Sequence, residues 1–114
     1  TELALKISEN VTESTYEKRK YIHLTAVFAC NFVNHLFSRA KEISDAQKIP
    51  FDYFLPLINE TVMKINEIDP KSAQTGPAVR NDKRILELHE QLLKDESLEI
   101  YKTMNLSIKK MYHL

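Results

Sequence analysis

The sequence predicts an all-α protein, a helical bundle with one long buried helix. Its 114 residues include one glycine and four prolines, which is less turn chemistry than a sheet of this size requires. Apolar residues also recur at the 3.6-residue spacing of helices over long runs. A chain of this length buries enough surface to fold without a disulfide or a metal. We therefore expect a single helical domain.

The pattern of the first 44 residues predicts a short helix, an extended connector and then the long helix. Leu3, Ala4 and Ile7 mark a short helix, and the β-branched and polar residues 11–15 predict an extended connector or short strand. The long helix should run from about residue 16 to residue 44. Apolar residues repeat there at every fourth position: Leu24, Phe28, Phe32, Leu36 and Ala40. Further apolar residues cover neighbouring directions, so we expect this helix to be buried.

Three further helices follow, separated by polar or proline-containing breaks. Residues 47–50 form the first break, and the next helix carries Pro56 near its first turns and ends at Asp69-Pro70. A polar loop is expected over residues 71–81, then a helix of three to four turns marked by Ile85, by Leu88 or His89, and by Leu92. A break at residues 95–97 precedes a last helix, whose core positions run from 98 to 111.

Composition excludes several functional classes. Sixteen basic and sixteen acidic side chains cancel, so nothing attracts the chain generally to nucleic acid or to an anionic membrane. The longest apolar run, residues 24–37, is broken by polar residues and is shorter than the roughly 20 that a membrane span requires. Cys30 is the only cysteine, which excludes an intrachain disulfide and suits a reducing compartment. We expect a cytoplasmic protein that binds neither nucleic acid nor membrane.

The segment from Thr75 to Asp82 is the strongest indication of a binding site. It holds the only glycine, Gly76, before a proline, and gathers hydroxyl, guanidinium, amide and carboxylate groups on one short loop. Such a loop suits a polar ligand. The alternative is a simple helix connection in which Asn81 or Asp82 caps the next helix. Arg80 stands just before that helix and suits an anion through its planar donor fork, or else pairs with Glu60 or Glu67.

Polar residues share one side of the long helix: His23, Cys30, Asn31, Asn34 and Ser38. At 100° per residue they fall within about a third of the circumference. Because burying unpaired amides and an imidazole is costly, this polar stripe should face a ligand cleft, another subunit or a satisfied hydrogen-bonded network. Metal sites fail on spacing, since no histidine follows a glutamate by three residues. A single glycine also excludes a glycine-rich loop that binds phosphate. We therefore expect that this chain alone contains no complete catalytic site.

Two segments together, residues 21–32 and the Thr75-Gly76-Pro77 turn with Arg80 and Asp82, resemble a bacterial family. Its members join a Rossmann-like domain to a helical C-terminal domain of formerly unknown function. The family is similar to pyrroline-5-carboxylate reductase, ketopantoate reductase and the 6-phosphogluconate dehydrogenase group. The resemblance implies an NAD(P)-dependent oxidoreductase, with residues 13–114 as its helical dimerisation and substrate-side domain. Residues 1–12 would be a linker or the tail of an absent Rossmann domain, and we expect a fragment because the chain starts at Thr1 without a leader.

The resemblance also implies roles for individual residues. We expect His23 to donate a proton and Arg80 to bind an anion. Asn31 and Thr75 should be neutral hydrogen-bond partners, and Gly76 should be the hinge of the loop. Asn34 and Asp82 complete the expected substrate contacts. The related hydroxyacid dehydrogenases use a lysine on the corresponding long helix, whereas the polar stripe of this chain offers His and Asn, so we do not expect lysine-assisted hydride transfer. We expect a homodimer, a small-molecule substrate and NAD(P) in the intact protein, with no cofactor bound by this chain alone. The alternative is a non-catalytic helical module for protein–protein interaction.

Overall fold

The structure, a computed structural model, describes residues 15–114 and confirms the all-α prediction. Every regular element in this part of the chain is a helix. The chain divides into two compact units, with the boundary between Phe51 and Asp52. We call them the N-terminal and C-terminal units and describe each by itself. The helix expected at residues 3–7 and most of the connector at 11–15 lie outside the described residues.

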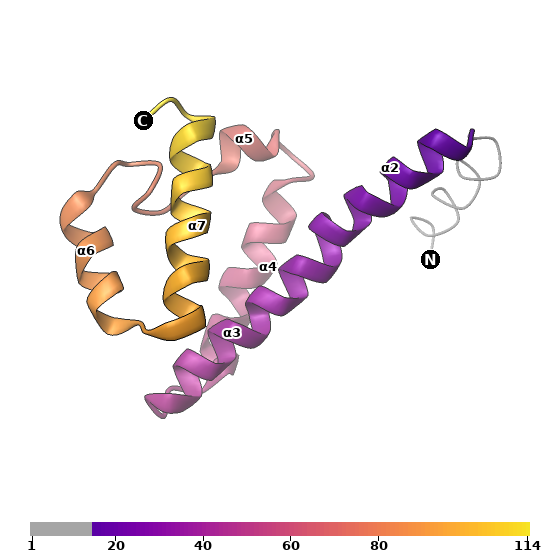
Figure 1. The fold of residues 1–114 in the computed structure, drawn as a ribbon. Coiled ribbons are helices and arrows are strands. Elements are labelled where there is room, and N and C mark those ends of the chain that lie inside the picture. The colour runs from indigo at the N-terminus through magenta and orange to yellow at the C-terminus, as the bar shows by residue number, and fades with distance from the viewer. Residues whose placement is uncertain (1–14) are drawn as a thin grey trace. The chain divides into compact units, whose positions relative to one another are not determined.

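The N-terminal unit contains the predicted long helix. It comprises α2 (Tyr16–Ala26), a π-helical segment η1 (Val27–Phe32) and α3 (Val33–Ala46), which follow one another without a break (Figure 1). Thr15 precedes the helix in an extended conformation, and its hydroxyl oxygen accepts a hydrogen bond of 3.3 Å from the Lys18 backbone N–H. The helix ends in a turn where Lys48 adopts a φ of 58°. The bounds agree with the sequence-based prediction to within two residues.

The π-helical segment explains the four-residue apolar repeat. In a regular α-helix, positions four apart drift by roughly 40°, so Leu24 and Leu36 would stand roughly 120° apart. A π turn closes its hydrogen bond one residue later than an α-helical turn. The extra residue reduces the accumulated rotation between Leu24 and Leu36 by roughly 100°. Leu24, Phe28, Phe32 and Leu36 therefore follow nearly one line, which we call the apolar line. The rings of Phe28 and Phe32 lie 4.9 Å apart on it, at an angle of 72°.

The prediction that this helix is buried is wrong for the chain as it stands. The side chains of Leu24, Phe28 and Phe32 are 49%, 62% and 50% exposed. The physical reason lies in the unit itself, whose described residues form this one continuous helix and the segment that follows it. The described residues of the unit thus offer no second element on which the helix could pack its apolar side, and they leave that side uncovered.

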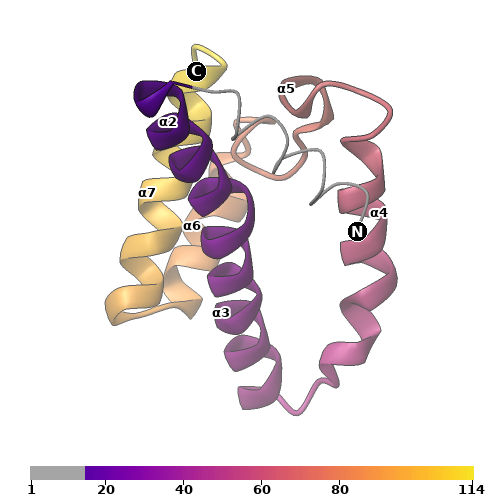
Figure 2. The ribbon, with the colours of Figure 1, turned by 90° about the vertical axis from the view of Figure 1, so that its right-hand side faces the viewer.

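The C-terminal unit holds four helices. A 3₁₀ turn, η2 (Phe51–Phe54), leads into α4 (Leu55–Lys64), which has Pro56 in its first turn, and then α5 (Pro70–Ala73), α6 (Lys83–Leu92) and α7 (Asp95–Met111) follow. Both Figure 1 and Figure 2 show α6 and α7 side by side and antiparallel. Ala78 and Leu86, 2% and 7% exposed, are its most buried apolar residues. The core of this unit is therefore small.

Three predicted breaks differ from the structure. Helix α4 ends at Lys64, ahead of the end expected at Asp69-Pro70, because the chain turns there and the Asn66 N–H donates to the Met63 carbonyl at 3.1 Å. Residues 71–73 belong to the short helix α5 instead of a loop, because Pro70 starts a helical turn in which the Ser72 and Ala73 N–H groups donate to the Asp69 carbonyl at 2.9 and 3.1 Å. The break expected at 95–97 falls earlier, at the extended residues Leu93 and Lys94. Asp95 and Glu96 lie in the first turn of α7, where negative charge favours a helix start.

One polar contact joins α6 to α7. The Nδ1 atom of His89 and the hydroxyl oxygen of Tyr101 are 2.8 Å apart, and their rings meet edge to face with centroids 5.7 Å apart. Both side chains are half-buried. With so few buried apolar residues nearby, this hydrogen bond should contribute measurably to holding the two helices together.

We predict that Tyr101→Phe lowers the free energy of unfolding by about 0.5 to 1.5 kcal/mol, because it removes the hydroxyl while keeping the ring. Urea unfolding followed by circular dichroism measures the change. Tyr53→Phe is the matched control, since Tyr53 is 72% exposed and its hydroxyl has no hydrogen-bond partner in the described part of the chain. Equal stability of the two variants would show that the His89–Tyr101 contact contributes nothing.

Candidate functional site

The Gly76 loop forms a compact turn, as the sequence predicts. Gly76 has a φ of 105°, a conformation that other residues rarely adopt. A Cβ atom at this position would meet nothing within 4 Å. Glycine is therefore favoured by the backbone conformation and not by a lack of room for a side chain. Three hydrogen bonds between backbone groups close the turn: Arg80 N–H to Gly76 O at 3.4 Å, Asn81 N–H to Ala78 O at 3.0 Å and Asp82 N–H to Pro77 O at 2.9 Å. The buried Ala78 anchors it.

Asp82 caps helix α6. Its carboxylate oxygen accepts a hydrogen bond of 3.3 Å from the Ile85 backbone N–H. The capping alternative considered for this segment is thus observed at Asp82, while Asn81 turns the chain with a φ of 53°. The carboxylate occupies the helix N-terminus, where an anionic ligand would otherwise be favoured.

Arg80 lies in the same loop, three residues before α6 begins, and its side chain is exposed. The alternative that it pairs with Glu60 or Glu67 is not observed, since no ion pair joins Arg80 to a carboxylate within the described residues. Its guanidinium group is therefore available to an anion from solution.

A groove of about 480 Å³ lies next to this loop, in the C-terminal unit. One wall is a face of α4 formed by Leu57, Glu60, Thr61 and Lys64, together with Ile65 just past the end of the helix. The other wall is α5 and the residues after it: Pro70, Ala73, Gln74 and Thr75. We call this space the α4–α5 groove. Of the predicted site residues, Thr75 lines it, directly before Gly76.

The remaining predicted site residues belong to the N-terminal unit. His23, Asn31 and Asn34 are all exposed, and no hydrogen bond joins their side chains to one another in the described structure. The satisfied network considered for the polar stripe is therefore not observed. Because the two sets of residues stand in different units, their meeting in one cleft stays a prediction.

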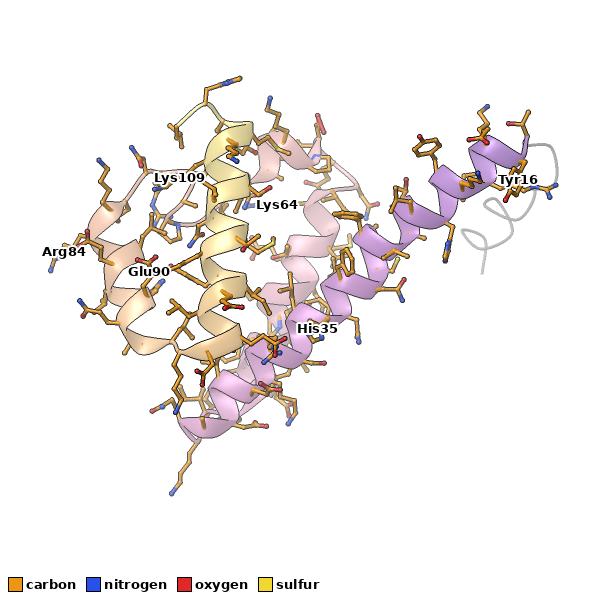
Figure 3. The ribbon with its side chains drawn as sticks, in the orientation of Figure 1. Tyr16, His35, Lys64, Arg84, Glu90 and Lys109 are labelled. Carbon is orange, nitrogen blue, oxygen red and sulfur yellow. The ribbon has the colours of Figure 1, made fainter. Side chains whose placement is uncertain are left out.

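The π-helical segment also changes the register of the polar stripe. It turns the residues after Phe32 by roughly 100° relative to those before Val27, one residue's share of an α-helical turn. His35 on α3, labelled in Figure 3, thereby replaces Asn34 as the residue nearest the line of His23. The sequence analysis missed His35 because it assumed regular α-helix. The sustained four-residue apolar repeat was the signal that could have revealed the wider turn.

Other chemistry is limited in the residues that the structure describes. No group of three or more His, Cys, Asp or Glu side chains there could hold a metal ion. None of the helices within residues 15–114 is both long and apolar enough to cross a membrane. Cys30 is a free, exposed thiol on η1.

Comparison with solved structures identifies a similar fold. The chain matches the crystal structure of a "putative NADP oxidoreductase" from Bacteroides fragilis with a TM-score of 0.82 and 42% sequence identity. The match covers 85% of this chain but 38% of that chain, so the present chain spans well under half of that protein's length. A comparison with curated proteins finds no match.

Comparison with protein families agrees with this likeness. Residues 1–108 match the family described as "Domain of unknown function (DUF2520)", and the match extends over most of the chain. The chain therefore belongs to the DUF2520 family.

Proposed function

We propose that this chain is the helical, substrate-side and dimer-forming domain of an NADP-dependent oxidoreductase. The observation that carries the proposal is the likeness, at 42% identity, to a protein described as a putative NADP oxidoreductase of which this chain spans 38%. In this proposal the remainder of such a protein supplies the dinucleotide-binding domain. The likeness to pyrroline-5-carboxylate reductase, ketopantoate reductase and the 6-phosphogluconate dehydrogenase group stays a prediction from the sequence.

The described residues suit contacts to the substrate better than binding of the dinucleotide. We call this separation of cofactor binding and substrate contacts between two domains the division of labour. A pyrophosphate group is usually held by a glycine-rich turn at a helix N-terminus. This chain has one glycine, and the nearby start of α6 is already capped by Asp82. The helical domain would instead contribute side chains to the substrate: His23 and Asn31 from the N-terminal unit, with His35 in the place expected for Asn34, and Thr75 and Arg80 from the C-terminal unit.

The dimer is proposed from the uncovered apolar line. Phe28 and Phe32 expose 62% and 50% of their surface, together with Leu24 at 49%. Contiguous exposed aromatic and aliphatic side chains are a frequent mark of a subunit interface. A nearly straight line of this kind suits the same helix of a second copy, because a twofold axis brings identical faces together.

Titration with NADPH tests the division of labour. We predict that isothermal titration calorimetry detects no saturable binding of NADPH to this 114-residue chain, while the full-length protein that contains it binds NADPH. Binding by the short chain in the micromolar range would overturn the proposal. Absence of binding by the full-length protein would favour the alternative, a helical module for protein–protein interaction.

Sedimentation tests the dimer. We predict that the chain sediments as a dimer at micromolar concentration and that Phe32→Glu makes it monomeric, because a carboxylate would have to be buried at the centre of the apolar line. Tyr16→Glu is the matched control, since Tyr16 is 72% exposed on the same long helix but precedes the line. A monomeric parent chain, or dimers that survive Phe32→Glu, would remove the interface from this helix.

Kinetics of the full-length protein test Arg80. We predict that Arg80→Lys lowers kcat/KM at least tenfold for a substrate that supports NADPH oxidation, because lysine keeps the charge but loses the planar donor fork. Arg84→Lys is the control, because Arg84 is exposed and its side chain projects away from α7 (Figure 3). A change of less than about twofold in Arg80→Lys, under roughly half a kcal/mol, would exclude a fork-specific role.

A further inference from the structure

The α4–α5 groove contains a pair of opposite charges that the proposed function does not use. Glu60 and Lys64 stand four residues apart on α4, with the glutamate nearer the N-terminus, and both line the groove. This spacing and order favour an ion pair along a helix. Lys41 and Asp45 have the same spacing on α3, and they pair at 2.7 Å.

Glu60 and Lys64 do not pair. No ion pair joins them, and neither side chain forms a hydrogen bond within the described residues. Lys64, labelled in Figure 3, is half-buried at the end of α4 that leads to α5. The groove thus presents one carboxylate and one ammonium group, each available to a partner from solution. A ligand that carries both charges would match them.

Neutral polar groups and apolar side chains complete the lining. The Thr61 hydroxyl donates a hydrogen bond of 2.9 Å to the Leu57 carbonyl, so its oxygen can still accept. The side-chain amide of Gln74 donates to the Thr75 carbonyl at 3.0 Å and keeps its own oxygen as an acceptor. Leu57 and Ile65 expose 62% and 55% of their surface. An apolar group of a ligand would cover this surface and be stabilised by it.

The wall of the groove opposite α4 is held in place from α7. The Tyr112 hydroxyl, just past the end of α7, donates a hydrogen bond to the Lys71 carbonyl in α5. The Lys71 ammonium group also lies 5.9 Å from the centre of the Tyr112 ring. Figure 1 shows α5 beside this end of α7. The α5 wall of the groove is therefore fixed to the end of α7 before any ligand arrives, which reduces the entropy lost on binding.

We propose that the α4–α5 groove binds a small zwitterion that carries an apolar group, the chemistry of an amino acid with an apolar side chain. Lys64 binds the carboxylate of the ligand, Glu60 binds its ammonium group, and Leu57 and Ile65 contact its apolar part. A volume of about 480 Å³ is in the size range of small-molecule sites. The inference rests on the groove alone and stands whether or not the intact protein is an oxidoreductase.

Three matched probes test the charge requirement: L-phenylalanine, 3-phenylpropanoate, which lacks the ammonium group, and 2-phenylethylamine, which lacks the carboxylate. Each is titrated into the ¹⁵N-labelled chain while amide resonances are recorded. We expect saturable shifts with L-phenylalanine, centred on Thr61, Lys64, Gln74 and Thr75. Either singly charged probe should bind at least fivefold more weakly, because each loses one ionic contact.

Two substitutions assign the charges. Lys64→Gln should weaken the binding of L-phenylalanine at least fivefold and leave the binding of 2-phenylethylamine unchanged. Glu60→Gln should also weaken the binding of L-phenylalanine at least fivefold, but it should leave the binding of 3-phenylpropanoate unchanged. Glu87→Gln and Lys102→Gln, exposed on α6 and α7, are the controls and should change nothing. Failure of L-phenylalanine to shift groove resonances at 20 mM would overturn the inference, as would equal binding of all three probes. Because these readouts measure neither NADPH nor dimerisation, their failure is distinguishable from failure of the proposed function.

Discussion

The apolar line of the long helix imposes the main physical constraint on this chain. Four large apolar side chains, Leu24, Phe28, Phe32 and Leu36, follow one side of the continuous helix that makes up most of the described N-terminal unit. Burial of such side chains is worth roughly 1.5 to 3 kcal/mol each. Leu24, Phe28 and Phe32 are 49%, 62% and 50% exposed, so part of that stabilisation is gained only on contact with another element. The dimer proposed above would supply it.

The π-helical segment makes this surface usable. In a regular α-helix, apolar side chains at every fourth position would drift around the helix axis, and a partner helix could cover only some of them. One wider turn keeps the apolar residues aligned, and it moves the polar stripe by the same rotation. The place of His23, Asn31 and His35 on the helix is therefore coupled to the geometry of the apolar line. A one-residue deletion in η1 would disturb both together.

The C-terminal unit is organised differently, by a few specific contacts in place of a large core. Its two most buried apolar residues are Ala78 and Leu86, and polar contacts join its elements: His89 to Tyr101 between α6 and α7, and Tyr112 to Lys71 between α7 and α5. The Asp82 cap and the Gly76 turn set the start of α6. The same unit contains the α4–α5 groove, whose two charges remain unpaired, in contrast to the Lys41–Asp45 pair on α3.

Local physical chemistry determined much of this structure from the sequence alone. Apolar periodicity predicted the longer helices, a lone glycine before proline predicted the turn at Gly76, and the polar residues after the loop predicted a cap at Asn81 or Asp82, since each depends on neighbours within a few residues. Tertiary structure decided what depends on distant groups: the exposure of the long helix, the pairing of His89 with Tyr101, and the groove where Lys64 and Gln74 join Thr75. The spacing of Glu60 and Lys64 favours an ion pair, yet the two side chains line the α4–α5 groove without pairing. Side-chain partners are selected by the three-dimensional surroundings, which a spacing along one helix does not contain.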